Sequence, residues 1–243
     1  MTQVYTHKTD LMRRVLHYAS HGYTYWKAGE IAPTKAEALA LKLADKYGTG
    51  RTETQRYRAK GRGEANTMLL MLHDPKDRDS PVYWWLMATP GAGLVHELEE
   101  LADIRSKRAN FTGYELLVLS RKRREKDKPD KASKPTWTWV MTQETFDGWK
   151  SRIQTAVRQD NEKLIKQMLH SLGKVPGFRG VRAQAYLLYR IARADWKRAR
   201  KGELPYPAPV VRYCGRYRKA TAVAVAEVSR KARRQKQKKV PVS

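Results

Sequence analysis

Apolar residues in the first fifty positions recur with two different periods. Leu11, Val15 and Tyr18 follow helical spacing after the capping residues Thr9 and Asp10, so they form the apolar stripe of an amphipathic helix. The next segment alternates aromatic and polar residues, as a half-buried strand does. A second stripe, rich in Ala and Leu, ends at a glycine, which commonly closes a helix. The pattern predicts a helix over 9–20, a strand over 23–31 and a helix over 33–48.

Strand-like patterns dominate between residues 51 and 142. The run 68–72 is apolar at every position, which is typical of a strand buried on both faces. The basic segment Arg56–Arg62 precedes it and predicts the first strand of a hairpin that turns at Lys60–Gly63. Helical spacing with an acidic first turn predicts a helix over 94–108. Further strands are predicted over 82–89, 113–123 and 135–142, with a charged loop from about Arg121 to Lys134 between the last two.

The remainder of the chain has the spacing of helices. Thr142 is a suitable N-cap for a helix that continues to about residue 173. A glycine-rich break over 173–180 precedes the longest predicted helix, 181–202, and an irregular segment leads to a last helix that frays into a tail. We therefore predict an α+β fold with a mixed or antiparallel sheet. Its expected domains are a core with N-terminal helices over 1–142 and a basic helical region over 143–243.

The charge balance indicates the class of partner. The chain has 50 Lys and Arg against 24 Asp and Glu in 243 residues, a formal net charge of +26. Such a charge destabilises a compact protein by self-repulsion unless a polyanion relieves it, so an enzyme acting on small metabolites is not expected. A nucleic-acid backbone is the usual polyanion. An anionic membrane would require a basic amphipathic helix with an apolar anchor, which the sequence lacks.

Other features of the composition narrow the setting. Hydrophobic residues make up 41% of the chain and there are seven Trp, so a folded protein is expected rather than a disordered basic arm. No apolar run is long enough to span a membrane, and the N-terminus lacks a secretory signal. The single cysteine, Cys214, excludes an intramolecular disulfide and a cysteine-rich zinc site. We expect a cytoplasmic protein from a prokaryote or mobile element, with no cofactor.

Positive charge gathers in the C-terminal third. Between Arg179 and Lys239 there are 19 Lys and Arg but only three acids. In the long predicted helix the cations lie beside an apolar stripe, so one side can pack while the other contacts phosphates; a solvated helix face is the alternative. The residues expected to contact RNA are Arg13, Arg14, Arg56, Arg58, Lys60, Arg62, Arg179, Arg182, Arg190, Arg193, Lys197, Arg200, Arg212, Arg216, Arg218, Arg230, Arg233 and Arg234.

Candidate chemistry is confined to the end of the first helix. The sequence has no paired-carboxylate nuclease cluster, no histidine pair of the HUH type and no P-loop. Metal-independent RNA cleavage requires less, namely a general base for a 2′-hydroxyl and a cation beside the phosphate. His17 and His21 are one helical turn apart and close in sequence to Tyr23. We take these three as candidate catalytic residues, with surface histidines at a helix end as the alternative and no metal site expected.

The layout resembles a known family of RNA enzymes. A basic chain of this size, with a sheet-and-helix core and the glycine-rich stretch Gly173–Gly180, is similar to the crRNA-processing endoribonucleases of CRISPR systems, in particular of type IV. That resemblance implies a ferredoxin-like core of the type found in repeat-associated RNA-binding (RAMP) proteins and RNA-recognition motifs. It also implies metal-independent cleavage of a repeat hairpin and retention of the crRNA in an effector complex. Gly177 and Gly180 are the residues that match the family's glycine-rich loop.

A second function class remains open. Plasmids and integrative elements also encode basic, non-enzymatic DNA-binding proteins that serve replication or partition. A helix-turn-helix would favour that class. The region from Arg13 to Ala44 has two predicted helices, but the segment between them is too extended and aromatic for the turn of that motif.

Overall fold

The computed structural model describes residues 2–77, 80–120, 135–200, 202–214 and 221–238, without the side chains of residues 236 and 238. The chain divides into two compact units, Met1–Lys107 with Arg216–Ser243, and Arg108–Gly215. This division does not coincide with the boundary expected at residue 142. Several predicted features lie outside the described residues: the charged loop between about Arg121 and Lys134, the end of the basic tail, and the residues Arg216 and Arg218.

The first unit contains a six-stranded mixed sheet in the order β5-β2-β4-β3-β1-β9. β1 and β3 are parallel, whereas the other neighbouring strands are antiparallel. The predicted α+β class with a mixed sheet is therefore confirmed. The strands are β1 (Gln3–Tyr5), β2 (Tyr25–Ile31), β3 (Thr67–Leu72), β4 (Val82–Ala88), β5 (Ala102–Asp103) and β9 (Ala222–Ala224).

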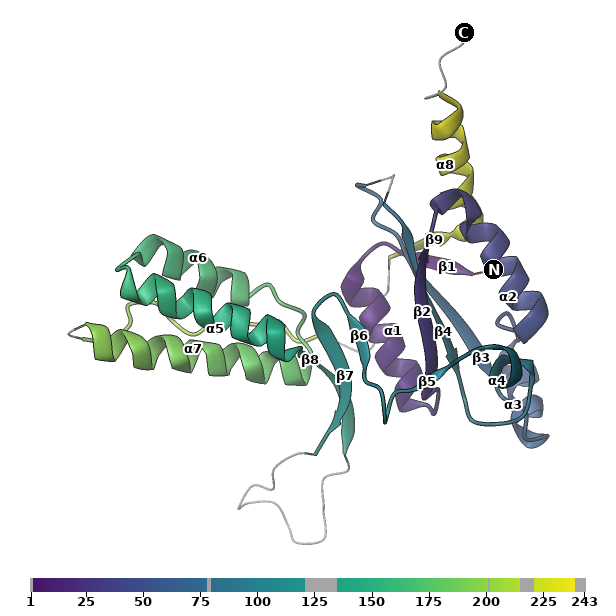
Figure 1. Ribbon diagram of the computed structural model, residues 1–243, viewed down its shortest axis with the longest axis horizontal. Helices are drawn as coiled ribbons and strands as arrows, with labels where there is room; N and C mark the ends of the chain where they lie inside the picture. The colour runs from purple at the N-terminus through teal and green to yellow at the C-terminus, as the bar shows by residue number, and fades with distance from the viewer. Residues whose placement is uncertain (1, 78–79, 121–134, 201, 215–220, 239–243) are drawn as a thin grey trace, which may run out of the picture. The chain divides into compact units, whose positions relative to one another are not determined.

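Helices cover both faces of this sheet (Figure 1). One face carries α1 (Lys8–Ser20), and the other carries α2 (Ala36–Tyr47) and α8 (Val225–Lys238). This arrangement explains why β3 is apolar from Met68 to Leu72: Leu69 and Met71 join the core beneath α2 and α8, and Leu70 between them points to the opposite face. The remaining short helices of the unit are η1 (Pro33–Lys35), α3 (Glu53–Gly61) and α4 (Leu94–Leu98).

The ferredoxin-like character is not confirmed. A ferredoxin-like module runs β-α-β-β-α-β, with its second and third strands consecutive. Here α2 and α3 separate β2 from β3, and the hairpin is formed by β3 and β4. The chain does open with a strand, a helix and a strand, because the unpredicted β1 precedes the first helix.

Three further predictions were wrong. Residues 53–61 form α3 instead of the first strand of a basic hairpin, because a capping box starts a helix at Thr52. The Thr52 hydroxyl accepts a hydrogen bond from the Gln55 amide, and the Thr52 amide donates one to the Gln55 side chain. The helix predicted over 94–108 ends at Leu98 and gives way to β5. The last helix was expected to begin at about Ala220, but Ala222–Ala224 form β9, which pairs with β1, and α8 begins only at Val225.

The second unit packs three helices with a three-stranded antiparallel sheet, in the order β6-β7-β8. Its strands are β6 (Ala109–Phe111), β7 (Tyr114–Leu119) and β8 (Thr136–Met141), and its helices are α5 (Gln143–Arg158), α6 (Glu162–Leu172) and α7 (Arg179–Ala199). Thr142 caps α5 as predicted, by accepting a hydrogen bond from the Thr145 amide. The irregular segment after α7 is also confirmed over 202–214.

The start of α7 lies against the edge of β8. The Gly180 amide donates to Thr138 Oγ1 at 3.1 Å, and the Gln184 side chain exchanges hydrogen bonds with both backbone groups of Met141, at 2.6 and 3.1 Å. A Cβ on Gly180 would lie 2.5 Å from Val140 Cγ1 and 2.6 Å from the Trp139 carbonyl oxygen. Only a glycine permits this approach, so α7 is held in a defined rotation about its own axis.

Candidate nucleic-acid interface

One face of α7 carries a continuous row of cations. Arg179, Arg182, Arg190, Arg193 and Lys197 are exposed, and Tyr186 completes the row. Successive members are three or four residues apart, so they share one face of the helix, opposite the buried side chains of Val181, Leu188 and Trp196. The row is about 27 Å long at 1.5 Å per residue. We call these six residues, Arg179, Arg182, Tyr186, Arg190, Arg193 and Lys197, the α7 stripe.

Aromatic rings lie among these cations. Tyr186 is 57% exposed between Arg182 and Arg190, and Tyr213 is 63% exposed with the Arg182 guanidinium 5.8 Å from its ring centroid. An exposed tyrosine beside arginines offers a stacking surface for an unpaired base next to groups that bind its phosphate. From the sequence alone, Tyr213 is a candidate for this role because Arg212 precedes it. Tyr186 was not singled out, although its spacing from Arg182 and Arg190 was visible.

Few carboxylates neutralise the α7 stripe. Arg193 pairs with Glu203 at 2.8 Å, and both side chains are more than half exposed, so this pair contributes little to stability and can exchange for a phosphate. Arg179 donates to the Leu119 carbonyl oxygen at 2.7 Å while remaining exposed. Arg190 and Lys197 have no ion pair among the described residues. The stripe therefore presents a net positive face.

Arg200, also predicted to contact RNA, serves a different purpose. Its Nε donates to Asp160 Oδ1 at 2.7 Å, a second nitrogen donates to the Val157 carbonyl oxygen, and its guanidinium lies 5.9 Å from the Trp196 ring centroid. Asp160 has a positive φ of 55° in the turn between α5 and α6. Arg200 thus ties the end of α7 to that turn, which leaves its side chain occupied by protein groups.

The glycine-rich stretch is part of the packing of the second unit. Gly177 is buried, and a Cβ there would lie 1.7 Å from the Arg212 carbonyl oxygen. The Cys214 amide also donates to the Gly177 carbonyl oxygen at 3.1 Å. Gly177 and Gly180 therefore face protein atoms, the former against the segment that carries Arg212 and the latter against β8. Arg212 itself is exposed and lines a cavity of about 780 Å³ together with Lys166 and Lys174.

In the first unit, the three candidate catalytic residues form one cluster of rings at the end of α1. The centroids of His17 and His21 are 4.2 Å apart, and His17 lies 5.3 Å from Tyr18. Tyr18 in turn lies 5.2 Å from Tyr23. His17 and His21 are exposed, whereas Tyr23 is buried. The sequence-based grouping of these residues agrees with their positions, and Tyr18 is the link between them.

Hydrogen bonding gives His21 a defined tautomer. Its Nδ1 lies 2.7 Å from the His17 carbonyl oxygen, and since a carbonyl oxygen only accepts, Nδ1 must carry the proton. The neutral ring then keeps a lone pair on Nε2, which is the form a general base needs. Tyr23 differs, because burial raises the pKa of its hydroxyl and the charge of Arg56 opposes that rise only in part. The Tyr23 hydroxyl therefore keeps its proton, so it can donate a hydrogen bond but is not suited to act as a base.

The adjacent arginines of α1 have separate roles. Arg13 is 5% exposed and donates to Asp10 Oδ1 at 2.6 Å, while Asp10 Oδ2 accepts from the Thr221 amide. Arg13 thus helps to hold α1 to the segment that leads into β9. Because its side chain is buried, it cannot make the predicted contact with RNA. Arg14 is exposed beside Tyr5. Burial raises the pKa of the Tyr5 hydroxyl, and the Arg14 guanidinium opposes part of the rise.

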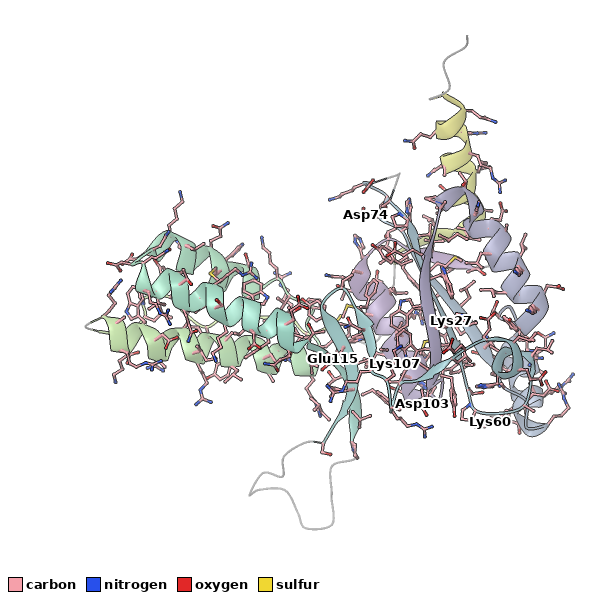
Figure 2. All side chains as sticks on the ribbon, in the orientation of Figure 1. Lys27, Lys60, Asp74, Asp103, Lys107 and Glu115 are labelled. Atoms are coloured by element: carbon pink, nitrogen blue, oxygen red, sulfur yellow. The ribbon has the colours of Figure 1, made fainter. Side chains whose placement is uncertain are left out.

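The cations predicted on a hairpin are instead distributed around α3. Arg58 and Lys60 are exposed on the helix, and Lys60 is labelled in Figure 2. Arg62 follows the helix and pairs with Glu64 at 2.6 Å. Arg56 is half-buried and faces the other way, toward Tyr23. A helix therefore separates these residues, with Arg58 and Lys60 outward and Arg56 inward, whereas a strand would have placed all four cations on one face.

The cations of α8 extend the basic surface of the first unit. Arg230 and Arg234 are exposed, and side chains ending in nitrogen project from this helix (Figure 2). Arg233 lies 3.6 Å from Glu37 and donates to the Thr34 carbonyl oxygen at 3.4 Å, so it helps to attach α8 to η1 and α2. Nothing comparable holds Arg230 or Arg234 among the described residues.

Sequence reasoning missed the loop between α2 and α3. Gly48 closes α2 in the left-handed conformation, and Thr49, Gly50 and Arg51 follow before the Thr52 cap. Two glycines in three residues immediately before a capping threonine were the available signal. In the described part of the chain, no three His, Cys, Asp or Glu side chains gather to form a metal site. No helix among those residues is both long and apolar enough to cross a membrane.

Comparison of this chain with protein-family models, with curated proteins and with solved structures finds no match in any of the three. The candidate interface therefore rests on the residues themselves: the α7 stripe in the second unit and the ring cluster of α1, with its neighbouring arginines, in the first.

Proposed function

We propose that this chain binds nucleic acid, and specifically structured RNA, through the α7 stripe. The observation that carries the proposal is the spacing of its five exposed cations along one face of α7. Each cation can contact a backbone phosphate, and the release of condensed counterions makes such contacts favourable.

Exposed tyrosines favour RNA with unpaired bases over duplex DNA. A phosphate clamp for a duplex needs cations alone, whereas Tyr186 and Tyr213 add ring faces that an unstacked base can cover. Hairpin loops and the single-stranded flanks of hairpins supply such bases in RNA. A DNA-binding accessory protein of a plasmid or integrative element is the competing proposal, and it predicts no contribution from these rings.

The test compares three labelled nucleic acids in fluorescence anisotropy titrations over a salt series. They are an RNA hairpin with single-stranded flanks, the DNA hairpin of the same sequence and a blunt DNA duplex. We expect tightest binding to the RNA hairpin, and Tyr186→Ala should weaken that complex more than the duplex complex. Equal binding to all three with no effect of Tyr186→Ala would refute the RNA proposal and favour the DNA one. Lys163→Gln, which removes an exposed cation of α6 outside the α7 stripe, is a control for the effect of net charge alone.

A second function, metal-independent RNA cleavage, is favoured by the ring cluster of α1. His21 Nε2 would take the proton of a 2′-hydroxyl, whose oxygen attacks the adjacent phosphorus and displaces the 5′-oxygen of the next nucleotide. The products are a 2′,3′-cyclic phosphate and a 5′-hydroxyl, the latter protonated by a second acid such as the His17 imidazolium or Tyr23. Arg14, one helical turn before Tyr18, would stabilise the phosphorane charge.

Cleavage is tested with EDTA present, using hairpin RNA and a copy with a single 2′-deoxy substitution at the cut. A CRISPR-repeat hairpin is one of the substrates, because the family resemblance implies it. Loss of cleavage in the 2′-deoxy copy and in His21→Ala, with binding retained, would support the proposal. Normal cleavage by both His17→Ala and His21→Ala would remove these residues from the mechanism, and absence of cleavage of every hairpin would leave the chain a binding protein.

A further inference from the structure

A cavity of about 490 Å³ opens beside β3 in the first unit. It exists because β1 is short: only Val4 and Tyr5 pair with β3, opposite Met71 and Leu72. The first half of β3, up to Leu70, therefore has β4 on one side and, among the described residues, no strand on the other. Residues from α1, α2 and the loop before α3 surround this opening in the sheet.

Three arginines from three different elements line the cavity. Arg14 comes from α1, Arg51 from the loop after α2, and Arg56 from α3. Arg51 is 3.4 Å from Glu64, which Arg62 already contacts at 2.6 Å. Arg14 and Arg56 have no ion pair among the described residues. Cations brought together in a partly enclosed space repel one another, and an anion that binds between them removes that cost.

A buried hydroxyl group also lacks a partner in this cavity wall. Thr49 is 7% exposed, and its Oγ1 is buried with no hydrogen-bond partner among the residues that the structure describes. Buried hydroxyls are nearly always hydrogen-bonded, because leaving one unpaired costs about 1–3 kcal/mol. Thr49 lies directly between Gly48 and Gly50, beside Arg51. An oxygen of a bound ligand would satisfy this hydroxyl and the arginines at the same time.

Apart from Thr2, Gln3 and Glu37, the rest of the lining is apolar or aromatic, and the Glu37 carboxylate lies 3.6 Å from Arg233. Ala40, Leu41 and Ala44 of α2 and Met68 of β3 contribute aliphatic surface, and the ring of Tyr18 lies on the α1 side. The volume falls in the range of pockets for small organic ligands, about 300–1,000 Å³. Phosphate alone would leave most of this space and all of its apolar wall unused.

We propose that this cavity binds a nucleoside phosphate, with the phosphate between Arg14, Arg51, Arg56 and the Thr49 hydroxyl and the base toward Tyr18 and the aliphatic wall. The nucleoside phosphate is either a free nucleotide or the phosphorylated end of a nucleic-acid strand. Every lining residue belongs to the first unit, so the inference does not depend on binding by the α7 stripe of the second unit.

Isothermal titration of the full chain with AMP, UMP, inorganic phosphate and adenosine tests the proposal. We expect a mononucleotide to bind more tightly than inorganic phosphate and adenosine not to bind. Arg14→Gln and Arg56→Gln should each weaken mononucleotide binding about tenfold or more, as expected when a charge-assisted hydrogen bond is lost. Thr49→Val, which keeps the shape of the side chain, should weaken it about threefold or more. Arg190→Gln, in the α7 stripe, is the control and should leave it unchanged.

Oligonucleotides distinguish the two sources of the ligand. If a 5′- or 3′-phosphorylated oligonucleotide competes with AMP and its unphosphorylated copy does not, the cavity accepts the phosphorylated end of a strand. If neither oligonucleotide competes, the ligand is a free nucleotide. The proposal is overturned if no mononucleotide binds. It is also overturned if the Arg14→Gln and Arg56→Gln variants, with unchanged thermal unfolding, still bind the mononucleotide. A third contrary result would be that these variants lose binding of an acidic peptide instead of a mononucleotide. Arg190→Gln should weaken the binding of RNA and leave the binding of mononucleotides unchanged. Failure of the cavity proposal and failure of the proposed RNA binding by the α7 stripe therefore give different results.

Discussion

The Tyr47 hydroxyl donates a 2.5 Å hydrogen bond to Glu99 Oε1, and the ammonium group of Lys27 binds the other oxygen of the same carboxylate at 2.7 Å. The three residues come from α2, β2 and the segment after α4, and Lys27 is labelled in Figure 2. The hydrogen bond from Lys27, followed by that from Tyr47, lowers the pKa of Glu99. Burial, followed by the bond to Glu99, raises the pKa of Tyr47 to about 12.

This contact predicts a loss of stability at both ends of the pH scale. Because the pKa of Glu99 is lower in the folded state, its stabilisation is present above the ordinary value of 4.5 and is lost as the pH falls through the folded value. Because the pKa of Tyr47 is higher in the folded state, its stabilisation is present below 10.0 and is lost as the pH rises toward about 12. Tyr47→Phe should lower the free energy of unfolding at pH 7 by about 1.5–3 kcal/mol and reduce the alkaline loss. Urea titrations across this pH range measure both effects.

Tyr57→Phe is the matched control for that measurement. Tyr57 is in the same unit but is 81% exposed, so removal of its hydroxyl should leave the free energy of unfolding within about 0.5 kcal/mol of the wild type at every pH. An alkaline loss of the same size in Tyr47→Phe and in the wild type would contradict the role assigned to Tyr47.

Cations of the α7 stripe should differ from their neighbours in salt dependence. Arg190→Gln combined with Lys197→Gln removes two phosphate contacts, so the slope of log K against log salt for RNA should become shallower by about 1.4–1.8. Lys163→Gln should leave the slope unchanged. The measurement is the anisotropy titration over a salt series. An unaltered slope in the double variant would show that this face of α7 is a solvated surface that does not contact RNA.

Arg200 should show the opposite behaviour. Its contacts with Asp160 and Val157 make it a structural residue, so Arg200→Gln should lower the free energy of unfolding by about 1 kcal/mol, a value kept small because Asp160 is 65% exposed. RNA affinity and its salt slope should be retained. Thermal unfolding and anisotropy titrations of Arg200→Gln and Arg190→Gln, measured side by side, check that the first variant loses stability and the second loses RNA affinity. A shallower salt slope in Arg200→Gln would show that Arg200 contacts RNA.

Two glycines of the second unit should respond in opposite directions to substitution by alanine. Gly177→Ala places a Cβ 1.7 Å from the Arg212 carbonyl oxygen, so the segment over 210–214 must move and the bond after Arg212 should become more sensitive to trypsin. Gly148 lies inside α5 with open space around it, so Gly148→Ala should raise the free energy of unfolding by about 0.5–1 kcal/mol. Equal trypsin cleavage after Arg212 in both variants would show that the segment does not depend on Gly177.

The sequence by itself determined the class of the fold, most elements and the excess of charge. Apolar periodicity is a local property of the chain, which is why α1, α2 and α7 were recognisable, as were β2, β3, β4, β7 and β8. The helical spacing of α5 and α6 was also recognisable, but the turn that divides them was not predicted. The net charge and the grouping of His17 with His21 are equally local. The cations of α7 could be assigned to one face because helical spacing alone relates Arg182 to Arg190.

Tertiary structure decided what those residues are available to do. Arg13 and Arg200 are as basic as Arg14 and Arg190, but Arg13 is buried against Asp10, which also binds the distant Thr221, and Arg200 is held by Asp160. The short strands β1 and β9 carry too few residues for a periodic signal and form only by pairing with strands distant in sequence, β9 with β1 and β1 also with β3. The cavity beside β3 depends on that pairing, because the length of β1 sets how much of β3 remains open, and no local pattern encodes that length.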